Sequence, residues 1–210
     1  MYHSKKHVLL IWAWLFIGTT YAQDIVSSTQ GFFLNLNGQF TSWSSESLYF
    51  GEIDDVSDGG IGISIRAGYG ITQNIEVFAE YGVAGISSDF SFDTYRISNF
   101  HIGGRYNFGA TLRAVRPFVE ASLSNQNLTI DPITFDQITF FESESSGWGG
   151  AIGGGVHYFF IPNLSASGLF RADFGNFGNT SLSGRDVSDL DEDLDYTIIS
   201  VQIGINYYFE

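Results

Sequence analysis

The stretch Gly60–Ile71, which reads GIGISIRAGYGI, decides the fold because large apolar residues occupy alternate positions along it. One face of an extended chain would carry Ile61, Ile63, Ile65, Ala67, Tyr69 and Ile71. The opposite face would carry glycines together with Ser64 and Arg66. Period-two alternation of this kind is typical of a half-buried β-strand. The stretch therefore predicts a strand with one apolar and one polar face.

The same alternation recurs along the chain and predicts eight strands. We place them at residues 31–43, 60–71, 75–86, 95–108, 117–128, 147–160, 164–177 and 196–209. These strands are longer than the 5–6 residues common in soluble sheets, and a tilted membrane strand needs about 9–11. In the fourth strand the apolar parity changes between Ile97 and Phe100, which predicts a β-bulge near Ser98 or Asn99.

The connections alternate between short and long. Residues 72–74, 109–116 and 161–163 are short links, whereas 44–59, 87–94, 129–146 and 178–195 are mostly long and polar. Short turns at one end and long loops at the other are typical of outer-membrane barrels. Residues 31–210 are therefore predicted to form an all-β fold, an eight-stranded antiparallel up-and-down transmembrane β-barrel. An even number of strands would place both termini on the periplasmic side.

The N-terminal segment has the features of an export signal. Lys5 and Lys6 precede an apolar run, Val8–Ile17, and small residues follow up to Ala22. The run is too short for a membrane helix, which needs about 20 apolar residues. We expect a signal peptide at 1–22, a short periplasmic segment at 23–30, and an exported protein in the outer membrane.

The charge is strongly acidic and unevenly distributed. The net charge of −14 makes nucleic acid an improbable partner, and the absence of cysteine excludes disulfides and thiolate metal sites. The long loops hold Glu46, Glu52, Asp54, Asp55, Asp58, Asp89, Asp93, Asp131, Asp136, Glu142, Glu144, Asp186, Asp189, Asp191, Glu192, Asp193 and Asp195. Such loops are a candidate contact surface for an extracellular partner.

Apart from Arg96, which lies at a loop edge, the charges within strands fall on the polar parity. They are Arg66, Glu76, Glu80, Arg105, Glu120, Arg171 and Asp173, and the same inward set includes Asn35, Asn37, His101, Gln126 and His157. An eight-stranded barrel leaves a lumen that side chains just fill. We predict a polar, ion-paired plug with a structural role; a gated ion path along these charges is the alternative.

Two other kinds of site were weighed. Asp189, Asp191, Asp193 and Asp195 alternate and form a weak Ca²⁺ candidate, but the glycine and distal Glu of a calcium-binding loop are missing. A solvated acidic loop is the simpler interpretation, and no other metal or cofactor is expected. After residue 22 the histidines are His101 and His157, both on the inward parity, so no serine nucleophile has a base beside it in a loop. An enzyme is not expected.

At this level the chain resembles the small outer-membrane β-barrels of OmpA/OmpX type. The likeness covers Gly31–Glu210 and rests on GYGITQNI at 68–75, RPFV at 116–119, YFFIPNL at 158–164 and the terminal YYF at 207–209. The resemblance implies lipid contact and insertion by the barrel-assembly machinery. That machinery would read the C-terminal aromatics Tyr207 and Phe209, although Glu210 follows them here.

Three functions are compatible with these patterns. A structural or surface-interaction barrel comes first, a small porin-like channel second, and a soluble lipocalin-like barrel third. A lipocalin would turn its apolar parity inward around a ligand. Aromatic residues of the apolar parity gather beside the short turns, as expected of an interfacial girdle. They are Tyr69, Tyr106, Phe108, Tyr158, Phe160, Tyr207 and Phe209.

Overall fold

The computed structural model of the chain describes residues 27–45, 56–87, 95–109, 111, 113–130, 134–135, 138–139, 143–182, 185–186 and 194–209. Its long strands are β1 (Gly31–Ser45), β2 (Val56–Gly70), β3 (Ile75–Ser87), β4 (Tyr95–Asn107), β5 (Val115–Ile130), β8 (Ser143–Ile161), β9 (Leu164–Leu182) and β11 (Leu194–Tyr208). Three strands of two residues each are β6 (Thr134–Phe135), β7 (Ile138–Thr139) and β10 (Arg185–Asp186). In the part of the chain described here, no helix is long and apolar enough to cross a membrane.

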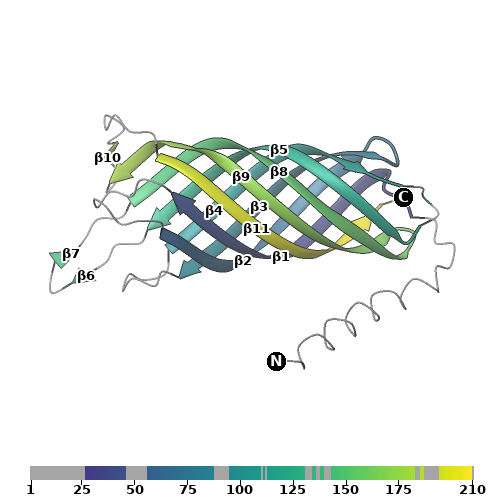
Figure 1. Cartoon of the computed structure of the whole chain (residues 1–210), viewed down its shortest axis with the longest axis horizontal. Coiled ribbons are helices and arrows are strands. Elements are labelled where there is room, and N and C mark those ends of the chain that lie inside the picture. The colour runs from purple at the N-terminus through teal and green to yellow at the C-terminus, as the bar shows by residue number, and fades with distance from the viewer. Residues whose placement is uncertain are drawn as a thin grey trace, which may run out of the picture.

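The sheet closes on itself because β1 is hydrogen-bonded on both sides. Asn35 of β1 lies opposite Arg66 of β2 and also opposite Asn206 of β11. The remaining long strands pair antiparallel with their neighbours along the chain, and β8 pairs with β9. The result is a closed barrel of eight long, tilted strands (Figure 1). Closure satisfies the backbone hydrogen bonds that a free strand edge would expose to hydrocarbon.

The two ends of the barrel differ. Residues 71–74, 108–114 and 162–163 link β2–β3, β4–β5 and β8–β9 at one end, which we name the turn end. The chain also leaves β11 there (Figure 1). We name the opposite end, where the connections after β1, β3, β5 and β9 begin, the loop end.

The predicted eight-stranded fold is confirmed, and the strand ends differ mainly at the loop end. β8 begins at Ser143 rather than residue 147, and β9 ends at Leu182 rather than 177. These extensions consist mostly of serine and other small or polar residues and show no apolar alternation. The backbone hydrogen bonds between strands continue through these extensions, beyond the apolar part of the wall. The periodicity of hydrophobic residues therefore predicts strands that are too short at this end.

The bulge predicted near Ser98 or Asn99 is wrong. β4 pairs with β3 and with β5 in continuous register through both residues. Ile97 is fully buried on the same inner face as Asn99 and His101. The parity change in the sequence therefore marks an apolar residue inside the lumen. Register shifts occur instead between β8 and β9, beside Gly147 and Ile161.

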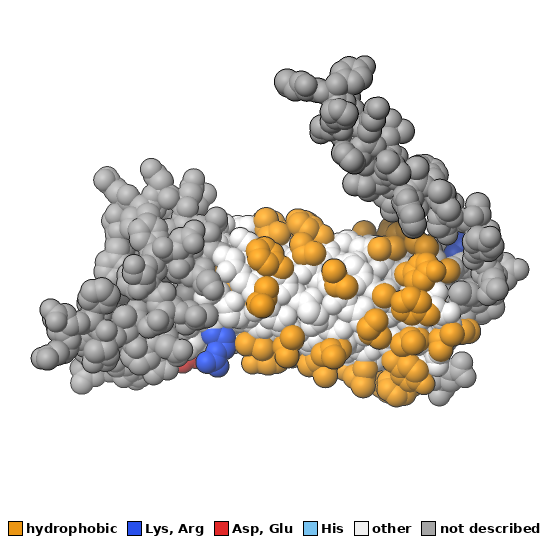
Figure 2. Space-filling view, turned by 90° about the horizontal axis from the view of Figure 1, so that it is seen from below, with side chains coloured by type: hydrophobic (Ala, Val, Ile, Leu, Met, Phe, Trp, Pro, Cys, Tyr) orange, Lys and Arg blue, Asp and Glu red, His pale blue; other side chains and the backbone are white. Residues whose placement is uncertain are grey.

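Side chains alternate between the outside and the lumen as the pattern of β2 predicts. Ile61 on the outer face is 77% exposed, whereas Arg66 on the inner face is 1% exposed. Hydrophobic side chains spread over the barrel wall, and the charged side chains visible in this view lie near its two ends (Figure 2). A soluble lipocalin-like barrel would have the reverse arrangement, so that alternative is wrong.

Aromatic side chains on the outer face pair edge to face near the turn end. Ring centroids are 5.0 Å apart for Tyr106 and Phe108, and 4.9 Å apart for Tyr207 and Phe209. Tyr158 and Phe160 form a third such pair, also two residues apart on one strand. All of them are exposed, as an interfacial girdle requires.

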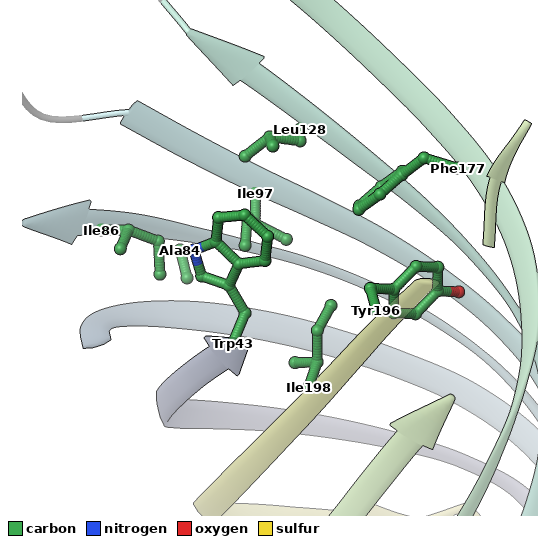
Figure 3. Packing of buried hydrophobic residues seen from close by; sticks show 8 residues of the cluster. All are labelled: Trp43, Ala84, Ile86, Ile97, Leu128, Phe177, Tyr196 and Ile198. Carbon is green, nitrogen blue, oxygen red and sulfur yellow. The ribbon is translucent and has the colours of Figure 1, made fainter. Parts of the chain in front are cut away.

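The lumen carries two apolar layers that the sequence analysis did not predict. The loop-end apolar layer consists of Trp43, Ala84, Ile86, Ile97, Leu128, Phe177, Tyr196 and Ile198 (Figure 3). The turn-end aromatic layer consists of Phe33, Phe78, Phe159 and Tyr208. The expectation of a polar interior thus needs correction at both ends, because apolar side chains are also buried on the inner face there.

We expect Ile203→Arg to test the outer face most severely, because Ile203 lies within β11 and is 72% exposed. An arginine there should lower the free energy of unfolding in lipid vesicles by about 2–4 kcal/mol. The same substitution at Ile161, beside a turn, should cost less than about 1 kcal/mol. Denaturant titration of the reconstituted protein measures both, and a cost at Ile203 no larger than at Ile161 would contradict a lipid-facing wall.

Candidate functional site

The charged residues predicted for the interior come from five strands and lie together in the lumen. Arg66 projects from β2, Glu76 and Glu80 from β3, Arg105 from β4, Glu120 from β5, and Arg171 and Asp173 from β9. All seven are buried. Strand alternation alone accounts for this, because each has the parity of the inner face on its strand.

Arg66 and two glutamates form the centre of the network. The Arg66 guanidinium lies 2.5 Å from the Glu80 carboxylate and 2.8 Å from the Glu120 carboxylate. With Glu120 the contact is bidentate, since Nη1 and Nη2 donate to separate carboxylate oxygens. Paired hydrogen bonds between charged groups fix orientation as well as supplying energy.

Arg105 and Arg171 extend the network to either side. Arg105 donates to Glu120 at 2.7 Å and lies 3.6 Å from Glu76. Arg171 lies 2.9 Å from Glu80 and 3.4 Å from Asp173. Each of the two central carboxylates therefore serves more than one arginine, and the ion pairs form one connected cluster.

Aromatic rings and neutral polar side chains make further contacts with the buried arginines and carboxylates. The guanidinium carbon of Arg66 lies 4.0 Å from the ring centre of Phe78, and that of Arg105 lies 3.9 Å from the ring centre of Phe118. Such cation–π contacts stabilise a desolvated cation. Gln202 donates to Glu80, and the hydroxyl of Tyr208 donates to Glu76.

The two histidines are buried parts of this lumen. His157 Nε2 lies 3.0 Å from Arg105 Nη1, and its Nδ1 lies 3.4 Å from Ser165 Oγ. His101 Nδ1 lies 3.3 Å from Ser122 Oγ and 3.6 Å from Asp173. A catalytic base needs one nitrogen for the nucleophile and the other for the carboxylate, whereas here both partners of His101 approach the same nitrogen.

The sequence analysis missed Arg116, which is also buried in the lumen. It was assigned to a connection, but β5 begins at Val115, so Arg116 shares the inner face with Phe118 and Glu120. Starting that strand two residues earlier would have identified it by parity. With Arg116 included, the buried charges among the described residues are four arginines and four carboxylates.

The remaining predicted sites lie mostly outside the described residues. Asp189, Asp191 and Asp193 are not among them, and Asp195 is exposed on β11. Within the described ranges, no group of three or more His, Cys, Asp or Glu side chains is placed to hold a metal ion. Tyr207 and Phe209, the predicted assembly signal, lie exposed at the turn end.

Substituting Glu120 tests how much the ion-pair network contributes to the free energy of unfolding. Glu120→Gln removes a negative charge that Arg66 and Arg105 share, and we expect a loss of about 3–5 kcal/mol in the free energy of unfolding. Glu144→Gln is the matched control, because Glu144 is exposed and accepts a hydrogen bond from the neutral side chain of Asn127. It should change stability by less than about 1 kcal/mol. Equal small effects in the two variants would contradict a network that contributes to stability.

Comparison with known proteins identifies the family. The model of the OprF membrane domain matches residues 45–207 of this chain. No curated protein matches the sequence.

Solved structures share the fold at low sequence identity. The crystal structure of Neisserial surface protein A superposes with a TM-score of 0.61 at 18% identity, covering 86% of this chain and 98% of that one. Outer membrane protein OprG from Pseudomonas aeruginosa gives 0.53 at 13% identity, covering 89% of this chain and 100% of that one. A major outer membrane protein from Thermus thermophilus gives 0.52 at 11% identity, covering 84% of this chain and 99% of that one.

These likenesses and the outward apolar face agree with the resemblance drawn from the sequence. The chain belongs to the OprF membrane domain family and is a small outer-membrane β-barrel.

Proposed function

We propose that this protein is a non-conducting, non-enzymatic outer-membrane barrel that anchors its acidic loops at the cell surface. In this proposal residues 1–22 are removed on export, and both ends of the remaining chain lie on the periplasmic side. The observation that supports the proposal is the sequence of buried side chains along the lumen, where an ion-paired layer lies between two apolar layers.

The ion-paired layer opposes the passage of a hydrated ion. Arg66, Glu80 and Glu120 are each nearly inaccessible to solvent and are bonded to side chains from other strands. Separating a buried ion pair leaves an uncompensated charge, which costs about 3–5 kcal/mol. A passing ion would have to displace several such contacts at once.

The loop-end apolar layer opposes conduction by a different mechanism. Trp43, Ile86, Ile97 and Ile198 point toward one another across the lumen (Figure 3). The isoleucine side chains have no polar groups that could replace the hydration shell of an ion. Apolar constrictions in channels block conduction by excluding water. The ion-paired layer and the apolar layer follow one another along the lumen and differ in chemistry. Together they support a non-conducting barrel.

The burial of the two described histidines supports a non-enzymatic role. Within the described residues both histidines are buried in the lumen, and His157 is held between Arg105 and Ser165. A substrate at the membrane surface would not reach either ring. In this proposal the acidic loops contact another molecule, and their charge favours a basic or cation-bridged surface.

A small channel is the second candidate, and buried polar atoms favour it. Gln39 Nε2, Thr41 Oγ1 and Asn99 Oδ1 are buried and have no hydrogen-bond partner among the described residues. Buried polar atoms are usually satisfied by water when no protein partner is present. Part of the lumen is therefore expected to be wet, although the layers on either side are dry or ion-paired.

Planar-bilayer recording distinguishes the two candidates. We expect no conductance above background for the wild type or for Arg105→Ala, because the loop-end apolar layer persists in the variant. Arg113→Ala is the matched control, since Arg113 is exposed outside the lumen. Steady conductance of the wild type would establish the channel instead. Conductance of Arg105→Ala alone would show that the ion pairs are the sole barrier and that the apolar layer is not one.

Cysteine labelling on intact cells tests the orientation. The chain has no cysteine, so a single introduced thiol is unambiguous. A membrane-impermeant maleimide should label Asp189→Cys in an acidic loop and leave Asn74→Cys, in the β2–β3 turn, unlabelled until the outer membrane is broken. The opposite result would invert the proposed topology.

A further inference from the structure

The residues just before β1 cross the turn end and contact every short connection there. The backbone N–H of Ser27 donates to the carbonyl of Thr111 at 2.6 Å, in the β4–β5 link. The N–H of Ser28 donates to the carbonyl of Pro162 at 2.7 Å, in the β8–β9 link. The N–H of Thr29 donates to the side-chain oxygen of Gln73 at 2.9 Å, in the β2–β3 link. We call residues 27–30 the strap.

Thr29 is the most strongly held residue of the strap. Its hydroxyl donates to the Gln73 carbonyl at 2.6 Å and accepts from Arg116 Nη1 at 3.0 Å. Arg116 also donates to the Gln73 carbonyl, so the three residues form a closed triangle of contacts. Ser27 and Thr29 are fully buried, whereas the ends of most domains are exposed and poorly held.

Two glycines fit the path of the strap. Gly31 has a φ of 99°, and this left-handed conformation turns the chain from the strap into β1. At Gly70, the end of β2, an added Cβ would lie 1.7 Å from the carbonyl oxygen of Thr29. Any larger residue at position 70 would therefore displace the strap.

The strap continues directly into the seam that closes the barrel. β1 and β11 are neighbours in the sheet although Asn35 and Asn206 come from opposite ends of the sequence, and no turn connects the two strands. At the turn end the seam is held by backbone hydrogen bonds such as Phe209 N–H to the Phe32 carbonyl. All other pairs of adjacent long strands are joined by a connection along the chain, which keeps their ends together.

We infer that the strap is a latch that locks the β1–β11 seam by tying the beginning of β1 to all three turns. Arg116 acts as its positioning residue, because it holds Thr29 and Gln73 together from the lumen side. For β1 to separate from β11 at this end, the strap would have to leave the turns at the same time. This latch is independent of whether the lumen conducts.

Amide hydrogen exchange of the folded barrel in lipid nanodiscs tests the latch. Thr29→Val keeps the shape of the side chain and removes the hydroxyl that joins Gln73 and Arg116. We expect exchange of the seam amides at 32–34 and 207–209 to become about tenfold faster, while amides of the β3–β4 pair keep their rates. Gly70→Ala should have the same regional effect, because its methyl group would displace the backbone of the strap at the Thr29 carbonyl while the Thr29 hydroxyl is kept.

Thr72→Val is the matched control. The Thr72 hydroxyl accepts from the backbone N–H groups of Asn74 and Ile75 within the same turn and makes no contact with the strap. Its loss should leave exchange at the seam unchanged. Equal acceleration of the seam by Thr72→Val would mean that loosening of the turn, not release of the strap, opens the barrel, and would overturn the inference.

A cross-link supplies an independent test. The pair Ser27→Cys and Thr111→Cys should form a disulfide in the folded barrel without competing thiols, since the native chain has none. In the Thr29→Val background the oxidised pair should restore slow exchange at the seam, and reduction should abolish the rescue. Unchanged seam exchange in both Thr29→Val and Gly70→Ala, or a cross-link that fails to rescue it, would contradict the latch.

Discussion

Compensation of buried charge is the constraint on which this barrel depends. Among the described residues, four arginines and four carboxylates are buried inside a wall whose outer face between the ends is apolar. The barrel wall separates each charge from the surrounding solvent. Its stabilisation therefore depends on other side chains of the lumen. An unpaired charge in that position costs several kcal/mol, so the inner face must balance its charges across strands. The connected contacts of Arg66, Arg105 and Arg171 with Glu80 and Glu120 meet that requirement.

The sequence predicted well which residues of each strand face outward and which face the lumen. This assignment depends only on alternation along a single strand. Ile61 and Arg66 need only their positions along one strand to be assigned to the outside and the inside. The pairing of particular charges was not predictable, since it depends on the stagger of strands that are far apart in sequence. Arg66 meets Glu120 across 54 residues, and Arg171 meets Glu80 across 91. No pattern within a strand contains that information.

The two errors have different physical origins. Ile97 was taken as evidence for a bulge because an apolar residue was expected to face lipid, yet the loop end of the lumen is itself apolar. For that residue, the two faces of a strand were assumed to differ in polarity along their whole length. The lumen instead changes character along the barrel axis, from an aromatic layer through the ion pairs to the loop-end apolar layer. Arg116 was assigned to a connection because the start of the strand was placed at residue 117, whereas β5 already pairs at Val115.

The direction in which the apolar face points is tested most directly by two tryptophans. Residues 23–210, produced without the proposed signal peptide, contain Trp43 and Trp148 as their tryptophans. Trp43 is 6% exposed within the loop-end apolar layer, whereas Trp148 is 67% exposed on the outer wall. In vesicles containing brominated lipids, Trp43→Phe leaves Trp148 as the fluorophore, and its emission should be strongly quenched. Trp148→Phe leaves Trp43, which should be quenched little; strong quenching of Trp43 with Trp148 unaffected would contradict the account.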